Sequence, residues 1–188
     1  MKSIPYDIDI ITMSVIFLVL SFLANYYLID KIRYIVIFKQ LLDDPNERSS
    51  HETSIPNLAG ISFFIAFMLG IYFLMPYDKN QIIFCFIPGL TILFVTGLKD
   101  DLLIISPISK LLAQTVSAAF LVFNSEFIIG SFHGFMGIEN IYPAFGIALA
   151  ILTIVTIINA INLIDGIDGL ASTVGIIIFS VFAVMFYM

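Results

Sequence analysis

Toward its C-terminal end the chain carries a polar run between two long apolar stretches. The carboxamides and carboxylates of this run are Asn159, Asn162, Asp165 and Asp168. The flanking residues 141–158 and 170–188 have the character of membrane spans, and ionisable groups at that depth are costly to remove from water. The run therefore indicates a functional site.

An unbroken helix would not gather these four side chains in one cluster. Steps of three residues drift by about 60° each around a helix, so the set would spread over half of its circumference. Gly166 and Gly169 allow one helix to end and another to begin within a few residues. We therefore expect residues 159–165 on the last turns of one helix and Asp168 at the start of the next. Helix capping is the alternative explanation for Asp168 and for Asp165.

A second acidic motif follows the third apolar stretch, where Asp100 and Asp101 are adjacent. The dipeptide Ser106-Pro107 is typical of a helix start, so the acidic pair precedes that helix rather than capping it. Adjacent carboxylates repel each other unless a positive charge compensates, and a divalent cation does so directly. The alternative is an interfacial acidic pair neutralised by water and by Lys99 or Lys110.

A third motif is the polar loop of residues 43–60, which holds Arg48 and His51. Taken alone, such a loop is explained as a solvated connector. The acids and carboxamides of the other two motifs form an all-oxygen set, which suits Mg²⁺ or Mn²⁺ and suits zinc or copper poorly. Because protein-bound magnesium often completes its shell with substrate phosphates, the implied substrate is a phosphate or diphosphate ester. Basic side chains at Arg48, His51, Lys99 and Lys110 would offset its remaining charge.

The composition indicates a polytopic membrane protein. Of 188 residues, 60% are hydrophobic and 12% are charged, and the mean hydropathy is +1.07. The net charge of −6 gives no support to a nucleic-acid partner, for which a basic face is expected. The single cysteine, Cys85, excludes an intrachain disulfide and a cysteine-based zinc cluster. Acidic residues follow Lys2 and no cleavage site is visible, so we expect a retained first span.

Six apolar stretches are near the length that crosses about 30 Å of hydrocarbon as a helix. They are residues 8–29, 58–77, 82–98, 111–129, 141–163 and 170–188. Most of the eight Lys and Arg residues follow the first and third stretches, which predicts that these segments face the cytoplasm. We expect an all-α polytopic membrane protein of about six transmembrane helices, a single integral membrane domain over residues 1–188, with its polar motifs on the cytoplasmic face.

The motifs resemble those of the polyprenyl-phosphate N-acetylhexosamine-1-phosphate transferases of the MraY and WecA kind, glycosyltransferase family 4. The matching segments are Asp44-Pro45-Asn46-x-Arg48-x-x-His51, Gly97-Leu98-x-Asp100-Asp101 with Ser106-Pro107-x-x-Lys110, and Asn159-x-x-Asn162-Leu163-x-Asp165-Gly166-x-Asp168-Gly169. They occur in the family's order, and the third is the most specific.

The resemblance implies an enzyme of the bacterial inner membrane, active at the cytoplasmic face. It would transfer a sugar 1-phosphate from a UDP-N-acetylsugar to a polyprenyl phosphate with Mg²⁺ or Mn²⁺, releasing UMP, for cell-wall or lipopolysaccharide biosynthesis. The implied catalytic and metal-binding residues are Asp100, Asp101 and Asp165. The implied substrate-binding residues are Arg48, His51, Lys110, Asn159, Asn162 and Asp168.

The first loop departs from the family pattern at Ser54, Asn57 and Ala59. Family members also have further spans, with another Asp and a His-rich loop, so the resemblance covers their N-terminal portion. We therefore expect the chain alone to be nearly inactive. Its expected partners, besides membrane lipid and the two substrates, are a separately encoded C-terminal half or another copy of itself.

Three other interpretations remain. A non-enzymatic cation transporter or channel would explain carboxylates within a membrane, but not the neighbouring loop with Arg48 and His51. A CDP-alcohol phosphotransferase also uses Asp-Gly steps, but its pattern needs an arginine after the first step, and this chain has none after Arg48. The third is a truncated, inactive or regulatory paralogue.

Overall fold

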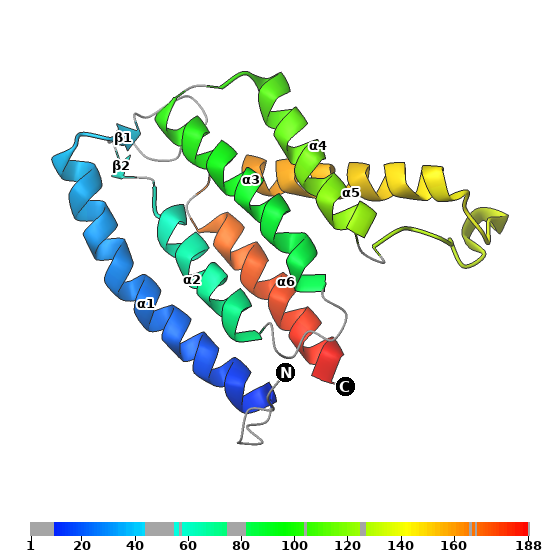
Figure 1. Cartoon of the computed structure of the whole chain (residues 1–188), viewed down its shortest axis with the longest axis horizontal. Helices are drawn as coiled ribbons and strands as arrows, with labels where there is room; N and C mark the ends of the chain where they lie inside the picture. Colours follow the sequence, from blue (N-terminus) through cyan, green and yellow to red (C-terminus); the bar gives the residue numbers. More distant parts are fainter. Residues whose placement is uncertain are drawn as a thin grey trace. The chain divides into compact units, whose positions relative to one another are not determined.

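The computed structural model of the chain describes residues 10–43, 55–56, 58–74, 82–103, 105–124, 127–165, 167 and 169–187. Within these residues the chain is almost entirely helical (Figure 1). The helices are α1 (Ile10–Phe38), α2 (Gly60–Leu74), α3 (Ile82–Leu102), α4 (Pro107–Asn124), α5 (Pro143–Ile164) and α6 (Leu170–Tyr187). The all-α class is confirmed, and a helix lies at each of the six predicted apolar stretches.

Two short antiparallel pairings close the longer connections. Strand β1 (Leu42–Asp43) pairs with β2 (Ile55–Pro56) at the base of the loop between α1 and α2. The interior of that loop lies outside the described residues. Between α4 and α5, Ser131 pairs with Asn140 around the short 3₁₀ helix η2 (Phe135–Gly137), which forms a small hairpin.

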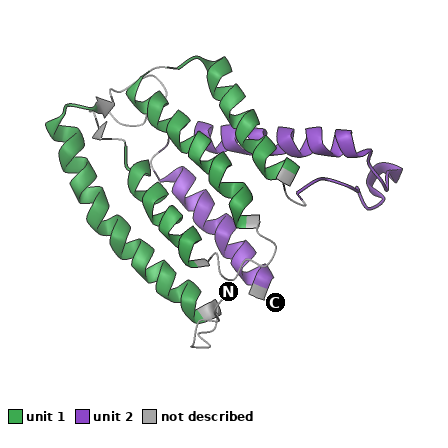
Figure 2. Cartoon of the chain, viewed as in Figure 1, with its two compact units in different colours: residues 1–43, 55–126 green, residues 44–54, 127–188 purple. Residues whose placement is uncertain are grey.

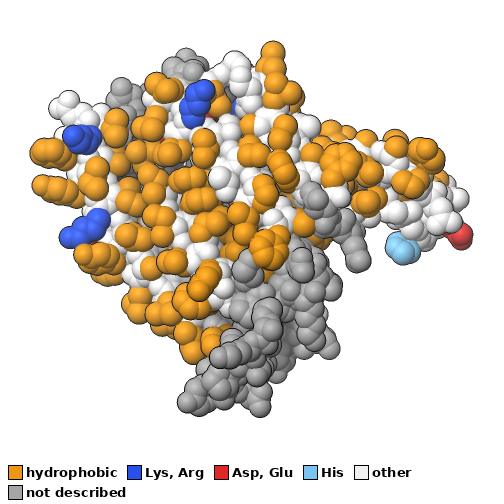
Figure 3. Space-filling view, in the orientation of Figure 1, with side chains coloured by type: hydrophobic (Ala, Val, Ile, Leu, Met, Phe, Trp, Pro, Cys, Tyr) orange, Lys and Arg blue, Asp and Glu red, His pale blue; other side chains and the backbone are white. Residues whose placement is uncertain are grey.

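Three helices in the described part of the chain are long and apolar enough to cross a membrane. They cover Thr12–Phe38, Ile83–Leu102 and Pro143–Ile164. The other three are apolar but shorter, over Gly60–Phe73, Pro107–Phe123 and Leu170–Phe186. Hydrophobic side chains are spread over most of the described surface visible in Figure 3, as expected for helices surrounded by lipid. These features indicate an integral membrane protein, while crossing by all six helices stays a prediction.

Two helices extend beyond the ends that hydropathy suggested. Helix α1 continues to Phe38, beyond the expected end at residue 29, because Asp30 and Lys31 lower the hydropathy without breaking the helix. Helix α3 continues to Leu102 and so carries the acidic pair in its last turn. Hydropathy reports the apolar segment, whereas the backbone hydrogen bonds decide where the helix ends.

The start of α4 is where the Ser106-Pro107 dipeptide predicted it. Pro107 is the first helical residue, and the backbone N–H of Ser109 donates to Ser106 Oγ at 3.2 Å. The serine hydroxyl therefore satisfies one of the amides that have no partner inside the helix.

The chain forms two compact units, which are coloured separately in Figure 2. Unit 1 comprises Met1–Asp43 and Ile55–Glu126, and unit 2 comprises Asp44–Ser54 and Phe127–Met188. In unit 1, α2 packs against α1 and α3, and α3 pairs closely with α4. In unit 2, α5 contacts α6. The single membrane domain over residues 1–188 stays a prediction.

The most extensive helix contact in unit 1 lies between α3 and α4. The buried residues of α4 are Gln114, Ser117, Ala118 and Val122. Ser117 Oγ donates a hydrogen bond to the Gly89 carbonyl oxygen at 2.7 Å, and a Cβ at Gly89 would lie 2.9 Å from the Ser117 carbonyl oxygen. Small residues and interhelical hydrogen bonds are the usual means of close helix packing in membranes. They hold α3 and α4 as an antiparallel helix pair.

Candidate functional site

In the acidic pair at the end of α3, Asp100 contacts the first turn of α4. Asp100 Oδ2 accepts a hydrogen bond from Lys110 Nζ at 2.7 Å, and each side chain of this ion pair is 29% exposed. Asp101 is exposed. Consecutive side chains on a helix are rotated by about 100°, so the two carboxylates point in different directions. Neutralisation by Lys110, one of the alternatives drawn from the sequence, is thus present at Asp100.

All three described acids of the candidate site lie where a helix ends. Asp100 and Asp101 are in the last turn of α3, and Asp165 is the C-cap of α5. The C-terminal end of a helix carries partial negative charge, which disfavours carboxylates and attracts cations. These acids therefore do not stabilise their own helices, and capping of α6 does not explain Asp165, which belongs to the end of α5.

The two carboxamides lie in the last turns of α5, as predicted. Asn159 is half-buried, and its Nδ2 donates to the Val155 carbonyl oxygen at 2.9 Å. Asn162 and Asp165 are exposed. The three polar side chains follow at three-residue steps up to the point where the helix stops.

The predicted break between α5 and α6 is also present. Gly169 has a φ of +74°, a left-handed conformation that L side chains rarely adopt. Its carbonyl oxygen accepts hydrogen bonds from Ser172 Oγ at 3.0 Å and Thr173 Oγ1 at 2.6 Å in the first turn of α6. Asp168 lies outside the described residues, as do Arg48 and His51.

A hollow of about 570 Å³ lies beside the turn between α3 and α4. Its lining residues are Val95, Thr96, Lys99, Leu103, Ile105, Ser106, Ser109 and Ala113. The hydroxyls of Ser106 and Ser109 are 2.8 Å apart on its wall. Thr96 and Ser109 are not part of the motifs predicted to form the site. The three-residue step from Ser106 to Ser109 is a sequence signal that the two hydroxyls share one face of the helix start.

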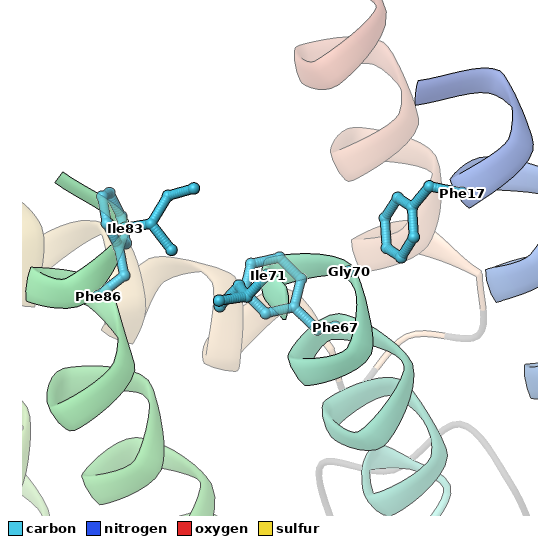
Figure 4. Close-up of a pocket in the computed structure, with 6 residues that line it drawn as sticks. All are labelled: Phe17, Phe67, Gly70, Ile71, Ile83 and Phe86. Carbon is cyan, nitrogen blue, oxygen red and sulfur yellow. The ribbon is translucent and has the colours of Figure 1, made fainter. Parts of the chain in front are cut away.

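A second cavity in unit 1 has no such chemistry. It measures about 230 Å³ and is lined by Phe17, Phe67, Gly70, Ile71, Ile83 and Phe86 (Figure 4). The ring of Phe17 occupies the space that a side chain at Gly70 would need. Because no lining side chain is charged or hydrogen-bonding, this cavity offers nothing to a phosphate.

The oxygen donors at the end of α3 fit a magnesium ion. Within the residues that the structure describes, no three His, Cys, Asp or Glu side chains are placed to share a metal. Magnesium, however, commonly takes only one or two carboxylates and completes its shell with water and phosphate oxygens. The Lys110 ammonium already occupies a cation position on Asp100. A cation is thus accommodated there, and the ligand chemistry is the one that Mg²⁺ prefers.

The fold is that of an integral membrane protein. Residues 83–188, more than half of the chain, match the family described as glycosyl transferase family 4, and the chain belongs to this family. The resemblance drawn from the sequence motifs is therefore confirmed. The matched region includes the second and third motifs and excludes the loop with Arg48 and His51.

The chain is also similar to the undecaprenyl-phosphate alpha-N-acetylglucosaminyl 1-phosphate transferase of Haemophilus influenzae. The two are 26% identical over 102 residues, which cover 54% of this chain and 28% of that protein. The match thus spans less than a third of the relative's length. No solved structure matches the chain.

Proposed function

We propose that this protein transfers a sugar 1-phosphate from a UDP-N-acetylsugar to a polyprenyl phosphate. The observation that carries the proposal is the family match over residues 83–188, which spans both acid-bearing helix ends, those of α3 and α5. The relative's name specifies an undecaprenyl phosphate acceptor and an N-acetylglucosaminyl 1-phosphate group for that protein. For this chain we propose two substrates, an anionic lipid phosphate as acceptor and a nucleoside diphosphate sugar as donor.

The order of the helices is consistent with acid-bearing ends of α3 and α5 on one side of the membrane. Helices α3 and α5 are each long enough to cross the bilayer. In this proposal α4 crosses the membrane between them, so that α3 and α5 end on the same side. In this proposal that side is the cytoplasmic face of a bacterial inner membrane, and the concentration of Lys and Arg after the first and third apolar stretches supports the cytoplasmic orientation.

In this proposal Asp100, Asp101 and Asp165 hold Mg²⁺. When bound, the ion would neutralise charge on the diphosphate and favour the departure of UMP. The residues assigned to substrate binding are Arg48, His51, Lys110, Asn159, Asn162 and Asp168. The basic members of this set offset the negative charge of two phosphate-bearing substrates, and the carboxamides offer hydrogen bonds to the nucleotide sugar.

The chemistry needs positioning more than a strong base. An oxygen of the polyprenyl phosphate bonds to the phosphorus that carries the sugar, and the bond from that phosphorus to UMP breaks. A phosphate monoester has a second pKa of about 6, so the attacking group is already largely dianionic at pH 7. Holding two anions in line therefore supplies much of the rate. A covalent aspartyl intermediate is the alternative to direct attack.

The test uses membranes that contain the chain, alone and co-expressed with the remaining spans of a family member. They receive polyprenyl phosphate, Mg²⁺ and one of several UDP-N-acetylsugars, and UMP and lipid-linked sugar are measured. We expect metal-dependent product from the co-expressed pair. Absence of product from both preparations, with metal flux through liposomes that hold the chain, would instead support the cation transporter.

A further inference from the structure

We propose that Lys110 occupies the cation position on Asp100 until a metal ion displaces it, and that the released ammonium then binds an anionic phosphate. This inference rests on the proposed function, because it takes Asp100 as a metal ligand. In this inference a single lysine couples metal binding to anion binding. The observation behind it is the 2.7 Å contact between Lys110 Nζ and Asp100 Oδ2.

Lys110 can make or leave this contact without any rearrangement of the helix backbones. Asp100 is in the last turn of α3, and Lys110 is near the start of α4. Deeper in the same pair, the hydrogen bond from Ser117 to Gly89 holds the two helices in close contact. The lysine side chain has four flexible carbons. It can therefore leave the carboxylate while α3 and α4 stay fixed.

An ammonium and a divalent cation would compete for Asp100 Oδ2. A magnesium ion held by Asp100 Oδ2 would compete with the hydrogen-bonded Lys110 ammonium for that oxygen. Two cations within a few Å also repel each other. Metal binding at this oxygen would therefore displace Lys110, and Lys110 lowers the metal affinity of the site while it stays.

The displaced ammonium remains attached to the start of α4. The hollow next to this turn is lined by Lys99 and by the hydroxyls of Ser106 and Ser109. A phosphate that ligates the metal would bring negative charge toward the released lysine. Because coupling between two ligands is reciprocal, metal would then strengthen phosphate binding and phosphate would strengthen metal binding.

The first measurement is Mn²⁺ binding to the purified chain in detergent, followed by the loss of free Mn²⁺ signal in electron paramagnetic resonance. Lys110→Gln removes the competing ammonium, and we expect it to tighten Mn²⁺ binding about fivefold, the upper range for a partly solvent-exposed ion pair. Lys99→Gln is the matched control, because it removes the same charge next to Asp100 without removing the observed ion pair. We expect this control to change Mn²⁺ affinity less than twofold.

The second measurement follows the Lys110 amine itself. Acylation of lysines by a water-soluble reagent, read by mass spectrometry, should become severalfold faster at Lys110 when Mg²⁺ is added. Lys99 in the same molecule serves as the internal control and should keep its rate. Inorganic phosphate added with Mg²⁺ should slow acylation of Lys110 again.

The outcomes separate this inference from the proposed function. Tighter Mn²⁺ binding in Lys110→Gln, with metal-induced acylation of Lys110, supports the exchange. If the wild-type chain binds Mn²⁺ and Lys110→Gln binds it equally or more weakly, the exchange is wrong while the metal site stands. If neither protein binds Mn²⁺, the assignment of Asp100 to the metal is wrong, and the exchange is wrong with it.

Discussion

A glycine at the contact between α3 and α4 gives the sharpest test of the packing that holds the acidic helix end. In Gly89→Ala, the added methyl group would lie 2.9 Å from the carbonyl oxygen and 3.0 Å from the hydroxyl of Ser117. Both atoms belong to the buried face of α4, so the helices must separate to accept it. Gly97→Ala is the matched control, because it lies on the same helix and its methyl group would meet nothing within 4 Å.

The size of the effect follows from three contributions. Overpacking of a well-packed contact destabilises by about 1–3 kcal/mol. Weakening of the interhelical hydrogen bond from Ser117 to Gly89 adds about 0.6 kcal/mol. Replacement of glycine by alanine within a helix favours folding by about 1 kcal/mol, but it does so in both variants and cancels. We therefore expect the free energy of unfolding of Gly89→Ala to be lower than that of Gly97→Ala by about 1.5–3.5 kcal/mol.

The assay is unfolding of the purified chain in mixed micelles, with increasing dodecyl sulfate and helix content followed by circular dichroism. The two variants are compared under identical lipid and detergent conditions. Equal unfolding free energies would show that α3 and α4 do not pack closely at Gly89. The same result would remove the basis for a fixed distance between Asp100 and Lys110.

Three further predictions concern other parts of the chain. Ser106→Ala should destabilise the protein by about 1 kcal/mol, because it removes the N-cap of α4. Its thermal midpoint should be lower than that of Ser106→Thr, which keeps the cap. Equal midpoints for these two variants would contradict the prediction. Gly146→Ala should lower the thermal midpoint well below that of Gly175→Ala, since only at Gly146 would a methyl group collide with the preceding loop backbone. Cysteines replacing Arg48 and Lys79, in a background without the native cysteine, should react with an impermeant reagent from opposite membrane sides, and labelling of both from one side would overturn the predicted topology.

The sequence was most informative where one local interaction decides the structure. The start of α4 was predictable because serine followed by proline can form an N-cap without any tertiary contact. The break before α6 was predictable because Gly169 permits a backbone conformation that other residues resist. The placement of Asn159, Asn162 and Asp165 on the last turns of α5 followed from these local rules.

The ion pair between Lys110 and Asp100 was predictable only as one of two alternatives. Lys99 and Lys110 are both near the acidic pair in sequence, and the choice between them depends on how α3 and α4 pack. That packing depends on Gly89 meeting Ser117, a contact between residues far apart in the sequence. Hydropathy also did not predict that α3 extends through Asp100 and Asp101, because charged residues end an apolar stretch without ending a helix.

The most direct test of the central claim is UMP release by membranes in which the chain is co-expressed with the remaining spans of a family member. Loss of one compensating charge at a phosphoryl-transfer site can be worth about 3 kcal/mol, or some two decades in rate. Asp100→Asn and Asp101→Asn should therefore lower metal-dependent UMP release at least about a hundredfold, at unchanged amounts of inserted protein. Asp30→Asn, an exposed acid of α1 outside the matched region, is the control and should retain activity. Full activity in both acidic-pair variants would contradict the account and leave Asp100 and Asp101 as interfacial acids.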